Sequence, residues 1–126
     1  MPKVMLVILF GALGTIARVG LSVAVERRSG EAFPFGTLTV NLIGCFAAGF
    51  LFYVFQVQAP SQSIWRDALL LGFLGAFTTF SALILQSFSL IQKGEIGSAM
   101  LYLGVSNAIG LLVLYAGFLL ASLMFK

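Results

Sequence analysis

Several polar side chains lie inside long apolar runs, where polar groups need partners. Asn41 carries an amide, and Thr79, Ser81 and Ser106 carry hydroxyls. Phe80 lies between two of these hydroxyls, and the edge of an aromatic ring is positive where its face is negative. A ring edge and several neutral donors could together replace the water around a strongly hydrated anion. The residue chemistry alone therefore predicts a path for a small anion.

Phe80 belongs to the segment GFLGAFTTFS at residues 72–81, in the middle of an apolar run. Glycines, threonines and a serine are concentrated in this short stretch. Irregular backbone at membrane depth is tolerated only where protein or a water-filled cavity satisfies its polar groups. Interrupted helices place free backbone carbonyls and amides at ion and substrate sites. We therefore expect this segment to break a membrane-spanning helix and to form the functional centre.

Three further features each allow two interpretations. Tyr102, Ser106 and Gly110 are spaced four apart on one helix face, which is either a polar stripe or a surface for helix packing. Asn41 either lines a polar path or makes an interhelical hydrogen bond. Arg18 lies inside an apolar run, near its expected end. Its side chain either extends to the membrane surface or attracts anions to a water-filled vestibule.

The chain lacks the residues that several other functions need. It has no histidine, and its four acidic residues fall in expected loops or at the ends of expected spans: Glu26, Glu31, Asp67 and Glu95. Proton-coupled exporters need an ionisable group at membrane depth, and many cation pores use carboxylate rings. The sequence contains no phosphate-binding loop, metal-ligand cluster or catalytic His or Cys pair. These features argue against a multidrug exporter, a cation pore and an enzyme.

The elements that position these residues follow from composition. The chain has 126 residues, 60% hydrophobic and 9% charged, with a mean hydropathy of +1.10. Soluble domains carry roughly 25% charged residues, so a soluble protein is nearly excluded. A spanning helix needs about 20 apolar residues, and the apolar runs predict spans at about 4–25, 37–57, 65–91 and 96–125. Residues 1–126 are thus expected to form one all-α membrane domain, with loops at 26–31, 58–64 and 92–95.

The basic residues are nearly balanced between the two ends of the predicted spans. One end carries Lys3, Arg66 and Lys126, the other carries Arg27, Arg28 and Lys93, and Arg18 would join the second group if it belonged with the first loop. Orientation is normally set by an excess of Lys and Arg in cytoplasmic loops. Without that excess, the chain can insert either way. We therefore expect dual topology, with oppositely oriented copies paired as an antiparallel homodimer.

Three sequence motifs resemble those of one known family, the CrcB or Fluc fluoride channels. GALGTIAR at residues 11–18 is similar to the family's glycine-rich first helix, which ends in Arg. GTLTVNLIGCFAAG at residues 36–49 is similar to its GTLxVNxxGxFxxG motif, and GFLGAFTTFS is similar to its GFxGxxTTFS signature. The three motifs occur in the family's order, and the resemblance covers essentially the whole chain.

The resemblance implies a dual-topology antiparallel dimer with two fluoride pathways and a structural sodium ion on the two-fold axis. The sodium ligands would be the backbone carbonyls of Gly75 and Thr78 from both subunits. The fluoride pathway would include Asn41, Phe80 and Ser81, and the hydroxyl donor of Thr79 adds that residue to the predicted pathway. The family's polar track on the fourth helix matches Tyr102 and Ser106, and its first-helix arginine matches Arg18.

The chain departs from the family pattern just after the signature. The family usually continues FSTF, whereas this sequence reads Phe80-Ser81-Ala82-Leu83. A second aromatic ring and a threonine hydroxyl are therefore missing, which puts half of the family's aromatic box in question.

Taken together, the residues and the resemblance predict a passive, fluoride-selective channel in the bacterial inner membrane that releases cytoplasmic fluoride. Its partners would be the fluoride ion, the lipid bilayer and a second copy of itself. A small dual-topology transporter of another solute is the alternative. A non-conducting membrane scaffold, in which the polar face serves only for packing, is a third possibility.

Overall fold

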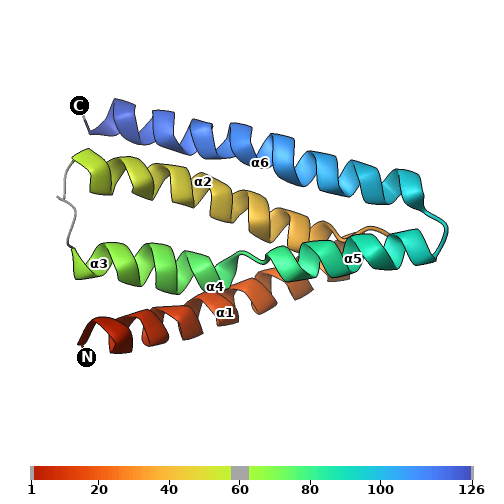
Figure 1. The fold of residues 1–126 in the computed structure, drawn as a ribbon, viewed down its shortest axis with the longest axis horizontal. Helices are drawn as coiled ribbons and strands as arrows, with labels where there is room; N and C mark the ends of the chain where they lie inside the picture. The colour runs from red at the N-terminus through yellow and green to blue at the C-terminus, as the bar shows by residue number, and fades with distance from the viewer. Residues whose placement is uncertain (1, 58–62, 126) are drawn as a thin grey trace.

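The computed structural model describes residues 2–57 and 63–125, and within them all regular secondary structure is helical (Figure 1). The elements are α1 (Pro2–Ser29), α2 (Phe35–Val57), α3 (Ile64–Asp67), the π-helix η1 (Ala68–Leu74), α4 (Gly75–Phe77), α5 (Phe80–Gln92) and α6 (Ile96–Met124). Four helical segments are long and apolar enough to cross a membrane, and the third of them joins α3 through α5. The predicted all-helical protein with four membrane-capable segments is therefore confirmed.

The first helix is longer than the sequence predicted. The expected loop at 26–31 begins later, because Glu26, Arg27 and Arg28 continue α1 to Ser29. These residues tolerate helix well, and two arginines in the last turn interact favourably with the negative end of the helix dipole. Gly30 then ends the helix with φ of 79°, a left-handed conformation that glycine adopts without strain. The first connection is therefore short and begins at Gly30.

The other two connections differ in how far they can be described. The last one is tight: α5 ends at Gln92, Gly94 has φ of 79°, and α6 begins at Ile96. Its hydrogen bond from the Glu95 amide to the Leu90 carbonyl, at 2.9 Å, closes the turn. Most of the loop predicted at 58–64, including Pro60, lies outside the described residues, as does Lys126.

The interior is packed through small residues more than through bulky ones. α2 and α6 lie side by side along their length (Figure 1). A Cβ on Gly49 would collide with the Leu114 carbonyl, and a Cβ on Gly117 would collide with the Phe46 carbonyl. The two helix backbones therefore touch, which is the way that helices associate when lipid provides no hydrophobic driving force.

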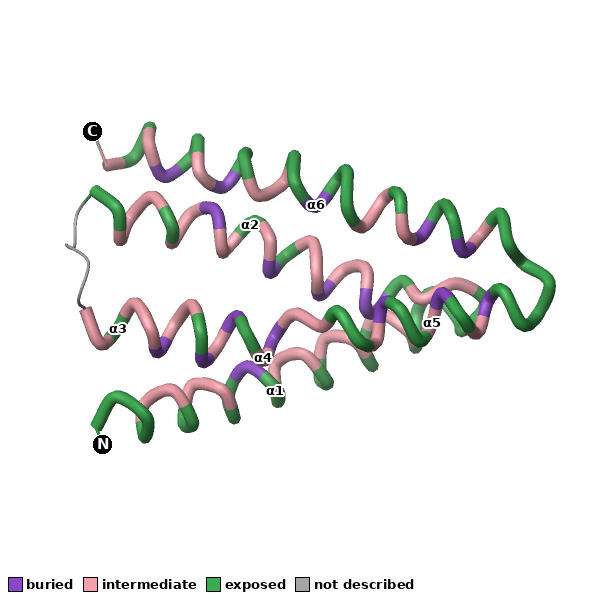
Figure 2. The backbone as a smooth tube through the Cα atoms, viewed as in Figure 1, coloured by how far each residue is buried: buried purple, intermediate pink, exposed green. Residues whose placement is uncertain are grey.

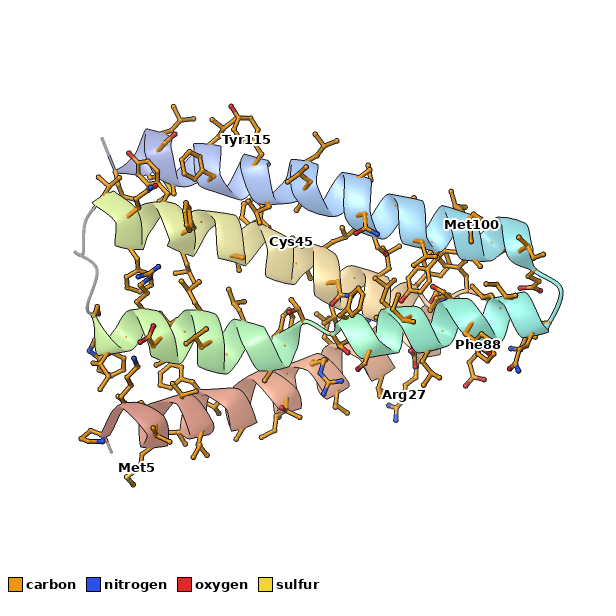
Figure 3. The ribbon with its side chains drawn as sticks, in the orientation of Figure 1. Met5, Arg27, Cys45, Phe88, Met100 and Tyr115 are labelled. Carbon is orange, nitrogen blue, oxygen red and sulfur yellow. The ribbon has the colours of Figure 1, made fainter. Side chains whose placement is uncertain are left out.

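Large apolar side chains cover much of the outside. Figure 2 shows exposed residues along all four spans, and Figure 3 shows Met5 on α1 and Tyr115 on α6 pointing away from the other helices. Exposed side chains of this kind include Leu71, Leu85, Leu111 and Phe80, each more than 60% exposed. Such an exterior suits a hydrocarbon environment rather than water.

Four helix ends gather at the same end of the bundle. The start of α1, the end of α2, the start of α3 and the end of α6 lie together on the left of Figure 1. Lys3 there pairs with Asp67 through Nζ and Oδ2, at 2.6 Å. Arg27, Arg28 and Lys93 lie toward the opposite end, in the arrangement that the sequence predicted from an even number of spans.

Candidate functional site

Two residues of extended backbone separate α4 from α5. Thr78 has φ and ψ of −86° and 156°, and Thr79 has −147° and 115°. The Thr79 hydroxyl caps α5 by accepting the Ala82 amide at 3.3 Å, a common role for threonine at a helix start. The Thr78 amide and hydroxyl both donate to the Leu74 carbonyl, at 3.0 and 2.9 Å. The threonine pair therefore ends one helix and starts the next.

Asn41 on α2 holds the backbone of Thr79 on both sides. Its Nδ2 donates to the Thr79 carbonyl at 3.1 Å, and its Oδ1 accepts the Thr79 amide at 2.8 Å. These bonds replace the ones that Thr79 would make inside a continuous helix. Of the two interpretations from sequence, the interhelical hydrogen bond is thus present, and the side chain also faces a cavity with Thr79.

The carbonyl groups at the end of α4 fall into two sets. Arg18 on α1 donates from Nε to the Ala76 carbonyl at 3.0 Å. Among the described residues, the carbonyls of Gly75, Phe77 and Thr78 accept no hydrogen bond. A helix end leaves its last carbonyls without intrahelical partners, so these three oxygens are available to a ligand or a partner chain.

Three cavities lie in a row and share lining residues. The largest of these three, of about 400 Å³, is bounded by Asn41, Gly75, Thr78, Phe80 and Ser106 among others. Thr79 also borders a second cavity of about 190 Å³, together with Arg18, Ser22, Thr37 and Gln86. Gln86 borders this second cavity and a third, of about 210 Å³, which is lined by Glu26, Glu31, Ser89 and Lys93 near the ends of α1 and α5. The row thus leads from the mouth near Lys93 to the threonine pair.

The polar face expected on the fourth span points inward. Tyr102 is completely buried, and Gly110 is buried beside Cys45. The Ser106 hydroxyl is also buried and is the one buried side-chain polar atom in the described part of the chain without a hydrogen-bond partner. Because Ser106 lines the largest cavity, its free hydroxyl is available to an occupant of that space.

Tyr102 is placed differently from the other predicted pathway residues. Its hydroxyl donates to Gln86 Oε1 at 2.8 Å, and its ring packs edge-on against Phe33 at 5.5 Å between centroids. It does not line any of the three cavities, and it contacts the row through Gln86. Gln86 was missed from sequence, although a polar amide inside the apolar run LILQSF is the same signal that drew attention to Asn41.

Phe80 and Ser81 lie on the outside of the protomer. Phe80 is 74% exposed, and Ser81 and Gly75 are exposed as well. Phe80 borders both the cavity of about 400 Å³ and an open apolar hollow of about 580 Å³ along α5, which is lined by Ile84, Leu85 and Phe88. Leu83, where the family pattern has phenylalanine, is only 6% exposed and belongs to the same buried cluster as Tyr102. The protomer therefore leaves the predicted anion-facing ring uncovered.

Comparison with known proteins places the chain in a family. The family model described as CrcB-like protein, Camphor Resistance (CrcB), matches residues 5–118. The chain belongs to the CrcB family. One CrcB relative, from Desulforapulum autotrophicum, is 43% identical over 122 residues, which cover 97% of this chain and 98% of the relative. Another, from Acidobacterium capsulatum, is 39% identical, covering 91% and 92%. A third, from Magnetococcus marinus, is 42% identical, covering 94% and 96%.

All three CrcB relatives carry the name fluoride-specific ion channel FluC. They come from bacteria and match almost their full length. With four apolar spans in addition, this CrcB protein is a multi-pass protein of the bacterial inner membrane.

Proposed function

We propose that this protein is a passive, fluoride-selective channel that lets cytoplasmic fluoride leave the cell. The observation that carries the proposal is the row of three cavities ending at the threonine pair. The lining residues of the largest cavity are uncharged, and Arg18 is the one charged residue lining the middle cavity in the described part of the chain. Amide and hydroxyl donors suit a small anion that must lose its water. The names of the relatives supply the choice of fluoride.

Outward release follows from the chemistry of the ion. Hydrogen fluoride is a neutral weak acid that crosses a membrane and dissociates in the less acidic cytoplasm, where the anion is trapped. A leak for the anion is then protective without ATP or a coupled ion. No acidic residue lines the two inner cavities among the residues that the structure describes, which supports a passive route over proton coupling.

We further propose that the pathway is completed in an antiparallel, dual-topology homodimer. Phe80 is exposed on the protomer, and its ring edge can serve an anion only if a second chain encloses it. The basic residues support insertion in both orientations: Arg18 is engaged with Ala76 inside the bundle, so it adds nothing to either end. One end of the bundle then carries Lys3 and Arg66, and the opposite end carries Arg27, Arg28 and Lys93. Lys126 lies outside the described residues. Such a dimer would contain two equivalent pathways.

The end of α4 also fits a structural sodium ion. Backbone carbonyls are hard oxygen donors of the kind that bind alkali cations in channels. The carbonyls of Gly75 and Thr78 accept no hydrogen bond within the described residues, and Gly75 is exposed on the protomer surface. In an antiparallel dimer, these residues of both chains would hold the ion. A bound sodium would supply the partners that these oxygens lack and would link the two subunits.

One liposome experiment tests this function. Purified protein is reconstituted into vesicles loaded with potassium fluoride, and efflux is followed with a fluoride electrode after addition of a potassium ionophore. We expect fluoride efflux that requires the ionophore, together with no chloride efflux under the same conditions. Flux that requires a proton gradient would point to a transporter instead. Silent vesicles containing correctly folded protein would refute conduction and favour a scaffold.

A further inference from the structure

Arg18 lies deeper in the first span than its place in the sequence suggested. Because α1 continues to Ser29, Arg18 is about three helical turns from the end of the helix rather than close to it. A guanidinium is always charged, and a charge at this depth is costly unless it is paired. The side chain is half-buried, and its Nε donates to the Ala76 carbonyl across the bundle. The Arg18 side chain therefore points into the bundle and does not extend to the membrane surface.

The Ala76 carbonyl lies between the two carbonyls proposed to bind sodium. Gly75 and Thr78 flank it, and neither accepts a hydrogen bond in the described residues, whereas Ala76 is satisfied by Arg18. On the far side of the break, Asn41 takes both backbone groups of Thr79. Side chains from α1 and α2 thus occupy the backbone groups at positions 76 and 79. Arg18 and Asn41 therefore determine which backbone carbonyls near the break have no hydrogen-bond donor.

We propose that Arg18 is a positioning residue for the sodium site, a role that rests on the function proposed above. Its Nε–H fixes the last turn of α4 by holding the Ala76 carbonyl toward α1. Successive residues of a helix are about 100° apart around the axis, so fixing Ala76 also fixes the direction in which Gly75 presents its carbonyl. Without this bond, the Ala76 carbonyl becomes a fourth free carbonyl beside those of Gly75, Phe77 and Thr78, and this end of α4 can rotate.

A competing role for Arg18 is to attract anions, since it also lines the middle cavity. Substitutions at this position separate the two roles. Gln has the same number of bonds from Cα to its side-chain nitrogen as Arg has to Nε, so R18Q keeps a donor at that place and removes the charge. R18M introduces an unbranched side chain and removes both the donor and the charge. R18K keeps the charge and a flexible donor. R28Q makes the same charge change at an exposed site on the same helix and is the matched control.

The readout is equilibrium binding of radiolabelled sodium to the purified protein in lipid nanodiscs, with fluoride efflux measured in parallel. If Arg18 positions the carbonyls, R18Q, R18K and R28Q should bind sodium within about threefold of the unmodified protein. R18M should bind at least about tenfold more weakly, as expected for the loss of a charge-assisted hydrogen bond. Fluoride efflux should follow sodium occupancy in R18M and recover at high sodium.

Four outcomes would overturn the proposal. Sodium binding by R18M equal to that of the unmodified protein would show that the hydrogen bond has no effect on the site. Equal weakening in R18Q and R18M would assign the effect to charge. If R18M does not fold, R18Q alone decides, because a tenfold loss in R18Q contradicts the role. If the unmodified protein binds no sodium, both the sodium site and this role of Arg18 are wrong. Fluoride efflux still tests the proposed channel function independently.

Discussion

Replacing Asn41 with Asp tests whether the amide that holds the helix break also faces the anion. The change keeps the acceptor that binds the Thr79 amide at 2.8 Å and removes the donor that binds the Thr79 carbonyl at 3.1 Å. A buried carbonyl left without a donor costs about 1–3 kcal/mol. The new carboxylate faces the largest cavity, where it would repel fluoride by about 3 kcal/mol at about 6 Å and an effective dielectric constant near 20.

Repulsion of this size alone corresponds to a reduction of about a hundredfold, since every 1.4 kcal/mol is about tenfold. We therefore expect the initial rate of fluoride efflux from N41D vesicles at neutral pH to be about a hundredth of the unmodified rate or lower. The helix break should be weakened as well, which circular dichroism during heating would detect as a lower midpoint of unfolding.

Asn107 provides the matched control. It is exposed on α6 and donates to the Leu103 carbonyl of its own helix at 2.7 Å. N107D makes the same chemical change away from the cavities and should leave efflux within about twofold. If N41D and N107D conduct equally well, Asn41 does not face the anion, and the placement of the pathway in the largest cavity is wrong.

Two further predictions concern the exposed ring and the helix packing. F80I should reduce fluoride efflux far more than F88I, because both side chains line the same apolar hollow but only Phe80 also borders the cavity of about 400 Å³; similar rates in the two variants would remove Phe80 from the pathway. G117A should lower the midpoint of thermal unfolding, since its Cβ would collide with the Phe46 carbonyl, at a cost of about 1–3 kcal/mol. G104A, on the same helix with nothing within 4 Å, should instead raise the midpoint slightly, and a shift of the same sign in both variants would contradict the close contact between α2 and α6.

Membership of the CrcB family and the four spans could be predicted from the sequence because both depend on local information. Spanning helices follow from the run of apolar residues, and their bounds mostly lie within a few residues of those predicted. The exception is the end of α1, where the charged residues Glu26, Arg27 and Arg28 predict a loop but continue the helix. Helix propensity and the cap at Gly30 decide that end instead.

The role of each polar residue at the threonine pair could not be read from local sequence. Arg18 contacts a carbonyl 58 positions away, and Asn41 contacts a backbone 38 positions away. Hydropathy indicates that such side chains need partners in a membrane, yet it does not indicate which partners they find. The same limit explains why the sequence places Tyr102 along the path, although the structure buries it behind Gln86.

The sequence by itself determined that the segment at 72–81 has unusual chemistry, because glycines, threonines and a serine in an apolar run are unusual whatever surrounds them. Only the tertiary structure decided which backbone groups of that segment are occupied. α1 and α2 bring Arg18 and Asn41 to Ala76 and Thr79, and they leave the carbonyls of Gly75 and Thr78 free among the described residues. The reason is geometric: every backbone carbonyl is chemically alike, and packing alone distinguishes the satisfied ones from the free ones.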